Sequence, residues 1–74
     1  NPATTWAAFD YTLPRITTYA KIVIKDITGK VIDEIPVNGV KGQKIWDTRN
    51  ITPGVYIYTL TTETMNKSGK IVVQ

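Results

Sequence analysis

The chain has 74 residues, 42% of them hydrophobic, and a net charge of +3, which fits one globular domain spanning residues 1–74. It contains no cysteine and no histidine, which excludes disulfides, thiolate sites, the commonest metal ligand and the ordinary charge switch near neutral pH. No apolar run approaches the ~20 residues that a membrane-spanning helix needs, and so short a chain is expected to be stable by only a few kcal/mol.

Alternation of apolar and polar residues predicts two half-buried strands in the N-terminal third. The first, Thr4–Leu13, places these apolar residues on one face: Ala7, Phe9, Tyr11 and Leu13. Trp6 lies on the opposite face with polar residues, so we expect it to be exposed or to lie at an end of the fold. Pro14 ends this strand, and the residues up to Thr18 lead to the second, Tyr19–Lys25. The second strand directs three side chains inward: Ala20, Ile22 and Ile24.

The segment Asp26–Lys30 is the clearest turn signal in the chain. Its aspartate can accept hydrogen bonds from the backbone ahead, and Gly29 supplies the left-handed residue of a type I turn with a G1 bulge. This predicts a hairpin between Tyr19–Lys25 and a strand at Val31–Ile35, which Pro36 ends.

The stretch Ile51–Leu60 combines a turn with the strand around which the other strands are expected to pack. Its Pro-Gly pair fits a type II turn with φ > 0 at Gly54. The strand that follows is apolar on both faces, with Val55 and Ile57 on one face and these residues on the other: Tyr56, Tyr58 and Leu60. Such a strand is typical of the interior of an assembly rather than its rim.

Strands are also predicted on both sides of this stretch. Asn38–Gly42 is expected to be a mobile loop, and Gln43–Asp47 a short strand that carries Trp46. Thr61–Gly69 is expected to hold the end of the preceding strand plus a hairpin loop, and Lys70–Gln74 a final strand. Because no helical period occurs and strands recur about every ten residues, the sequence indicates an all-β sandwich or small barrel.

The sequence does not support catalysis, which needs an activated nucleophile, paired acids or a metal. Ser68 is the only serine and has no histidine to activate it, and the adjacent Asp33 and Glu34 point to opposite faces of a strand. No glycine-rich phosphate loop precedes a helix. We therefore expect no enzyme activity, no catalytic or metal-binding residue and no cofactor. The nine lysines and arginines are scattered, so we expect no nucleic-acid partner.

Four blocks of the chain, taken in order, resemble one family. Asn1–Ala3 is similar to the end of that family's opening Pro-Asn-Pro-Ala motif, and Ala20–Lys30 to its strand–Gly turn–strand block. Thr52–Tyr58 is similar to its Pro-x-Gly-x-Tyr block, and Gly69–Gln74 to its basic-apolar ending, although many members end in Lys or Arg. The family is the C-terminal sorting domain of proteins exported by the type IX (Por) secretion system of Bacteroidetes, and the resemblance covers nearly the whole chain.

This resemblance implies an immunoglobulin-like antiparallel β-sandwich of about seven short strands. It also implies a non-catalytic address: the type IX translocon at the outer membrane reads the folded domain and moves the N-terminal cargo from the periplasm to the cell surface or extracellular space. A sortase-type peptidase then removes the domain upstream of Asn1. Because the chain begins without Met, we expect it to be a piece of a longer protein. The implied translocon-recognition residues are these: Gly54, Tyr56, Gly69, Lys70, Ile71, Val72, Val73 and Gln74.

The role of the closing strand is open. Lys70–Gln74 either offers its edge to a partner by strand addition or is an ordinary structural strand. Since Ile71–Val73 is apolar on both faces, we expect the isolated domain to self-associate through strand edges.

The alternative function is that of an accessory immunoglobulin-like module of a secreted enzyme, binding polysaccharide or acting as a spacer. A stacking platform would be drawn from these residues: Trp6, Tyr11, Tyr19, Trp46, Tyr56 and Tyr58. Their alternation matches the strand faces, which favours the interpretation that most of them fill the core. An exposed coplanar pair would favour sugar binding, and a buried set would favour sorting.

Overall fold

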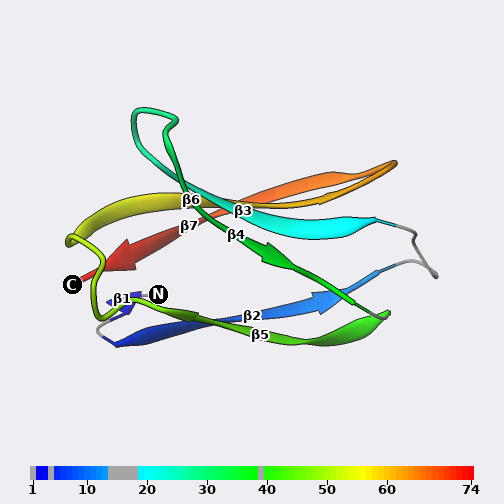
Figure 1. The fold of residues 1–74 in the computed structure, drawn as a ribbon, viewed down its shortest axis with the longest axis horizontal. Coiled ribbons are helices and arrows are strands. Elements are labelled where there is room, and N and C mark those ends of the chain that lie inside the picture. The colour runs from blue at the N-terminus through cyan, green and yellow to red at the C-terminus, as the bar shows by residue number, and fades with distance from the viewer. Residues whose placement is uncertain (1, 4, 14–18, 39) are drawn as a thin grey trace.

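The computed structural model describes residues 2–3, 5–13, 19–38 and 40–74 (Figure 1). Within these ranges the chain forms seven strands: β1 (Pro2–Ala3), β2 (Trp6–Thr12), β3 (Ala20–Asp26), β4 (Val31–Pro36), β5 (Lys41–Asp47), β6 (Gly54–Thr62) and β7 (Asn66–Val73). None of the described residues is helical, as the sequence predicted. The predicted connection at residues 14–18, and Gly39 of the predicted loop, lie outside the described residues.

The strands form two sheets that face each other as the layers of a sandwich (Figure 1). The large sheet has five strands in the order β1-β7-β6-β3-β4, and the small sheet consists of β2 and β5. The pairs are antiparallel except for the short parallel pair of β1 with β7. The predicted immunoglobulin-like β-sandwich is thus confirmed. Because two strands face five, the small sheet covers only part of the large one.

The core lies between the sheets and is built from residues at alternate positions of each strand. Its buried hydrophobic members are these: Phe9, Tyr11, Leu13, Ile22, Ile24, Val37, Trp46, Tyr56, Leu60, Ile71 and Val73. Aromatic contacts join the layers, with ring centroids of Phe9 and Tyr58 5.0 Å apart and those of Trp46 and Tyr56 5.7 Å apart. The inward residues predicted for the first two strands are confirmed, and Trp6, 56% exposed, lies outside the core as expected.

The hairpin between β3 and β4 turns at Asp26–Lys30, as the sequence predicted. Gly29 has a φ of 91°, in the left-handed region, and its amide donates to the Asp26 carbonyl at 3.1 Å. The Asp26 carboxylate accepts hydrogen bonds from the Thr28 hydroxyl and from the amides of Thr28 and Lys30. These bonds, the Thr28 hydroxyl first, hold the pKa of Asp26 below its ordinary value. A shift of register beside the turn marks a bulge.

β6 is the middle strand of the large sheet, between β7 and β3, as predicted for the stretch Ile51–Leu60. Burial on both of its faces is not observed, because Val55 is 39% and Ile57 37% exposed whereas Tyr56 and Leu60 are buried. The small sheet covers only one face of the large sheet, so the outer face of β6 meets solvent.

Two predicted loops are shorter than expected. β5 begins at Lys41, so Gly42 belongs to a strand, and a Cβ at Gly42 would come within 2.7 Å of the Tyr11 hydroxyl oxygen. β7 begins at Asn66, earlier than predicted, which leaves residues 63–65 between the strands of the last hairpin. In both places, pairing with a neighbouring strand overrides the weak strand propensity of glycine and polar residues.

Candidate functional site

Within the Thr52–Tyr56 segment, Tyr56 connects the turn before β6 to the core. The Tyr56 hydroxyl donates a hydrogen bond to the backbone carbonyl of Thr52, and the Tyr56 ring packs edge-on against Trp46. Tyr56 is therefore held by its hydroxyl on the turn and by its ring between the sheets. This predicted recognition residue is 7% exposed, so it stabilises the turn from inside the domain.

Gly54 is the first residue of β6 and pairs with Val73. Its φ is 157°, so the predicted positive φ at Gly54 is confirmed. A type II turn needs about +80° at this position, so the predicted turn type is wrong. The chain is already extended at Gly54 because strand pairing begins there. Gly54 is exposed, at the end of the large sheet.

Tyr58 of β6 lies over Gly69 of β7, its cross-strand partner. A Cβ added at Gly69 would overlap the Tyr58 ring, so this position of β7 has no room for a side chain. Because Gly69 has no side chain, the Tyr58 ring can lie against β7 and contact Phe9 of the small sheet. Gly69, another predicted recognition residue, is thus required by packing.

The closing segment of the chain divides between the two faces of the large sheet. Ile71 is 6% and Val73 2% exposed, and both belong to the core. Lys70 and Gln74 are exposed, and Val72 is half-buried on the outer side. β1 pairs with Val72 and Val73, so at these two residues the edge considered for strand addition is already occupied within the domain.

Residues of β3, β6 and β7 form one exposed surface, called here the β6–β7 outer face: Lys25, Val55, Ile57, Lys70 and Val72. Ile57 lies between Lys25 and Lys70 in one cross-strand row, and Val55 lies beside Val72 in another row. The surface is an apolar ridge with a lysine on each side of Ile57. It brings together three of the four sequence blocks described above, which are far apart along the chain.

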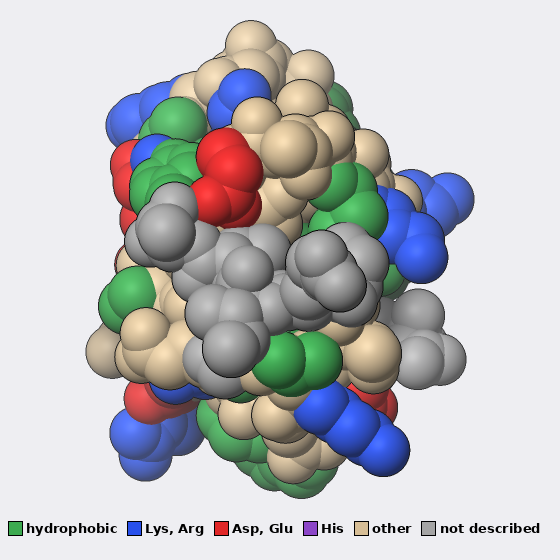
Figure 2. All heavy atoms as spheres, turned by 90° about the vertical axis from the view of Figure 1, so that its right-hand side faces the viewer, with side chains coloured by type: hydrophobic (Ala, Val, Ile, Leu, Met, Phe, Trp, Pro, Cys, Tyr) green, Lys and Arg blue, Asp and Glu red, His purple; other side chains and the backbone are tan. Residues whose placement is uncertain are grey.

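Charge on this face comes from its two lysines. The ion pairs found among the described residues are Lys21–Glu34 at 3.0 Å and Arg49–Asp47 at 2.7 Å, and neither involves the β6–β7 outer face. Figure 2 shows one end of the sandwich, where lysine and arginine side chains are spread around the rim rather than gathered in one patch. This spread fits the scattered basic residues of the sequence.

The Asp47–Arg49 pair gives a pH prediction. The Arg49 guanidinium and amide donate hydrogen bonds to the Asp47 carboxylate, the guanidinium bonds contributing most, and lower the pKa of Asp47 from 3.8 to about 2. Because the folded pKa is the lower one, the pair stabilises the fold fully only above the unfolded pKa of 3.8, and this contribution is lost as the pH falls through about 2.

An NMR titration of the Asp47 carboxyl carbon should therefore have its midpoint near 2. Arg49→Gln should raise this midpoint toward the ordinary value, because the charged donor is lost. The same midpoint in both proteins would show that Arg49 does not control this carboxyl.

The residues that the structure describes contain no catalytic arrangement. Asp33 accepts a hydrogen bond from the Trp46 indole nitrogen at 3.2 Å, while Glu34 binds Lys21, so the two acids face opposite ways as predicted. The Ser68 hydroxyl is hydrogen-bonded to its cross-strand neighbour at 2.9 Å. In these ranges no three His, Cys, Asp or Glu side chains gather as a metal site would require, and no helix suited to crossing a bilayer is present.

Most of the aromatic residues considered for a sugar platform lie in the core: Tyr11, Trp46, Tyr56 and the half-buried Tyr58. Trp6 on β2 and Tyr19 before β3 are 56% and 45% exposed, and they belong to different layers of the sandwich. Both ring-to-ring contacts in the described part of the chain are inside the core. The core interpretation of these aromatic residues is therefore confirmed for most of them.

The whole chain, residues 1–74, matches the family model described as the secretion system C-terminal sorting domain. The chain belongs to this family. The resemblance drawn from the four sequence blocks is thus confirmed, and the sorting domain is a signal for type IX secretion, the system of Bacteroidetes that exports proteins to the cell surface. Comparisons with curated proteins and with solved structures found no significant match.

Sequence reasoning missed two members of the outer face of this sorting domain, Val55 and Ile57, because it placed them inside the assembly. One signal was present: Thr59 and Thr61 continue the same face of β6 with polar residues, which indicates solvent on that side. Lys25 follows the inward Ile24 in the predicted strand, so alternation places it on the outer face. Its position beside Ile57 follows only from the β3–β6 register.

Proposed function

We propose that residues 1–74 form a single non-catalytic domain that the type IX outer-membrane translocon recognises in its folded form. The domain carries its N-terminal cargo through the periplasm to the cell surface or extracellular space. A sortase-type peptidase then removes it upstream of Asn1. Its partners are the translocon and sortase components and the covalently attached cargo, and the family match supports this role.

One observation carries the location of the recognition surface: three family-like blocks meet on the β6–β7 outer face. Within the predicted recognition set, the accessible members contact the translocon: Gly54, Lys70, Val72 and Gln74. The other members support this surface from the core side: Tyr56, Gly69, Ile71 and Val73. Aliphatic side chains between lysines suit a partner with an apolar contact area and acidic residues around it, because apolar burial supplies affinity and charge sets orientation.

Charge reversal on this face is expected to reduce export. The assay compares surface display of a reporter that carries an ordinary periplasmic signal and this domain at its C-terminus. For Lys70→Glu we expect display to fall about tenfold, which corresponds to ~1.4 kcal/mol of recognition. Lys41→Glu makes the same change on β5, away from the face, and should be displayed normally. Exposed substitutions usually shift stability by less than about 0.5 kcal/mol, so circular dichroism should show both variants folded.

A second arm tests the C-terminal end of the domain. A folded, inert tag after Gln74 leaves β7 intact but blocks its end, and the double change Lys70→Ala with Gln74→Ala removes the polar groups there. Both fusions should accumulate in the periplasm. Normal display of every variant, each of them folded, would place recognition elsewhere, for example on the Asp26–Lys30 turn. An unmodified fusion that is never displayed would reject the sorting role itself.

Self-association of the isolated domain through strand edges stays a prediction. Because β1 covers Val72 and Val73, the closing strand contributes less open edge than the sequence indicated. Light scattering at high protein concentration checks it, and a strictly monomeric mass would contradict it.

A further inference from the structure

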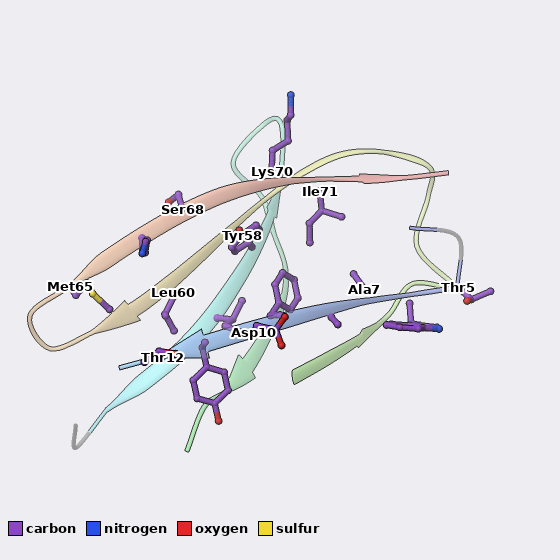
Figure 3. A pocket seen from close by; sticks show the side chains of 16 residues that line it. Thr5, Ala7, Asp10, Thr12, Tyr58, Leu60, Met65, Ser68, Lys70 and Ile71 are labelled. Carbon is purple, nitrogen blue, oxygen red and sulfur yellow. The ribbon is translucent and has the colours of Figure 1, made fainter. Parts of the chain in front are cut away.

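A groove runs along one side of the sandwich, between β2 of the small sheet and β7 of the large sheet (Figure 3). Its volume is about 910 Å³, and its lining includes these side chains: Ala7, Phe9, Tyr58, Leu60, Lys67 and Ile71. In Figure 3, Ile71 points from β7 toward β2, whereas Lys70 points away from the groove. The groove exists because the small sheet leaves the β7 side of the large sheet uncovered.

Backbone groups of β2 border this groove. The Leu13 amide donates to the Val40 carbonyl at 2.6 Å, and the Thr5 carbonyl accepts from the Thr48 amide at 2.9 Å, so the odd-numbered residues bond toward β5. In an antiparallel pair, alternate residues turn their N–H and C=O groups to opposite edges. The even-numbered residues of β2, with Ala8 at the centre, therefore turn theirs toward the groove. No described strand pairs with this edge.

The β2 edge differs from the other strand edges of the described chain. β1 has only two residues and contains Pro2, and β4 carries Asp33, Glu34 and a terminal Pro36. β5 and β7 each carry two lysines. Such charges and prolines keep edges from pairing with other chains. β2 has a single charge, Asp10, no proline, and a register with β5 that contains no bulge. Among these edges, β2 therefore has the fewest features that prevent pairing with another strand.

Lys67 gives one end of the groove a positive charge. It occupies an inward position of β7, opposite Leu60, yet its side chain is exposed. Neither ion pair of the described residues includes it. The other end of the floor is apolar, with Ile71 on the same strand. The inward side chains of a strand lying along β2 would meet Ile71, then the Tyr58 ring over Gly69, and then Lys67.

We propose that the β2 edge binds one extended strand of a partner protein, with apolar side chains toward Ile71 and an acidic side chain toward Lys67. Backbone hydrogen bonds to β2 supply the pairing, and the floor of the groove selects the side chains. A separate strand suits this edge better than a second copy of the sandwich, because the large sheet of an antiparallel second copy would also extend past β2 into the same groove. The occupant is therefore a separate extended segment, and the site is distinct from the β6–β7 outer face.

The probe is a fluorescent octapeptide with blocked termini. Threonine occupies every second position, and the four positions between hold valine, valine, glutamate and valine in that order. A matched peptide carries lysine in place of glutamate. Fluorescence anisotropy of each peptide is measured against increasing concentrations of the 74-residue chain. We expect saturable binding of the glutamate peptide and about tenfold weaker binding of the lysine peptide, because the lysine would lie against Lys67.

Substitutions at the centre of the edge test the strand pairing. Ala8→Pro removes an N–H that faces the groove and keeps the bonds to β5, an arrangement that edge strands tolerate. It should weaken binding of the glutamate peptide about tenfold, because a backbone hydrogen bond is lost and the ring obstructs the edge. Ala8→Thr keeps the N–H and should bind within about twofold of the wild type.

Substitutions of lysine test the charge. Lys67→Glu should weaken binding of the glutamate peptide about tenfold and strengthen binding of the lysine peptide. Lys41→Glu changes the net charge equally at a site on β5 and should leave both affinities unchanged. Circular dichroism verifies that each variant is folded before its affinity is compared.

Three results would overturn the proposal. One is absence of saturable binding by the folded wild type, and another is equal affinity of Ala8→Pro and Ala8→Thr. The third comes from sedimentation: a wild-type dimer that Ala8→Pro converts to a monomer would make a second copy the occupant. The proposal is supported if the wild type binds the glutamate peptide and both Ala8→Pro and Lys67→Glu lose this binding.

Discussion

Gly69→Ala is expected to lower the free energy of unfolding by about 1–3 kcal/mol, the range for overpacking a core. The added Cβ would overlap the Tyr58 ring, which lies directly over Gly69 in the cross-strand pair. The ring cannot move inward without displacing Phe9, whose centroid is 5.0 Å away. For a domain stable by only a few kcal/mol, this one methyl group removes a large share of the stability.

A double-mutant cycle in urea denaturation checks this cause. In a Tyr58→Ala background the obstructing ring is absent, so Gly69→Ala should cost at least about 1 kcal/mol less than in the wild type. If Gly69→Ala costs the same in both backgrounds, the Tyr58 ring is not the obstruction. The result also bears on recognition, since it would explain the glycine of the closing block by packing rather than by contact with the translocon.

Trp46→Ala should have the largest effect of any single substitution considered, about 3–5 kcal/mol, as for other buried tryptophans. The side chain is 2% exposed, packs edge-on against Tyr56 and donates its indole N–H to Asp33. Its removal leaves a cavity between the sheets, takes the indole donor from one Asp33 oxygen and removes the edge contact of the Tyr56 ring. We expect the variant to be largely unfolded at 25 °C, because the loss equals or exceeds the stability of so small a domain.

Trp6→Ala is the matched control for this prediction. It makes the same chemical change on a side chain that is 56% exposed on the outer side of the small sheet. The midpoint of urea denaturation, followed by circular dichroism, should then shift by less than about 0.5 kcal/mol in free energy. Comparable losses for the two tryptophans would contradict the assignment of Trp46 to the core and of Trp6 to the surface.

The two tryptophan variants also separate folding from recognition in the export assay. If the translocon reads the folded domain, Trp46→Ala should abolish display of the reporter, whereas Trp6→Ala should not. Display of an unfolded Trp46→Ala fusion would indicate that a linear segment is sufficient. Lys70→Glu differs from both, since it leaves the fold intact and alters only the β6–β7 outer face.

Much of the fold follows from local pattern alone. Period-2 alternation was enough to find β2 and β3, to assign Phe9 and Ile24 to the core and to leave Trp6 outside. Glycine at the fourth position of Asp26–Lys30 was enough to find the hairpin, because the left-handed φ it needs is costly for other residues. The four sequence blocks were enough to find the family.

Only the tertiary structure shows which strand faces are covered and how distant strands are aligned. Alternation gives the face on which a side chain lies, but not whether another sheet covers that face. Val55 and Ile57 are exposed because the small sheet packs on the opposite face of the large sheet. Register between distant strands placed Tyr58 over Gly69 and Ile57 between two lysines. These arrangements depend on contacts between residues far apart in the chain, which no short window of sequence contains.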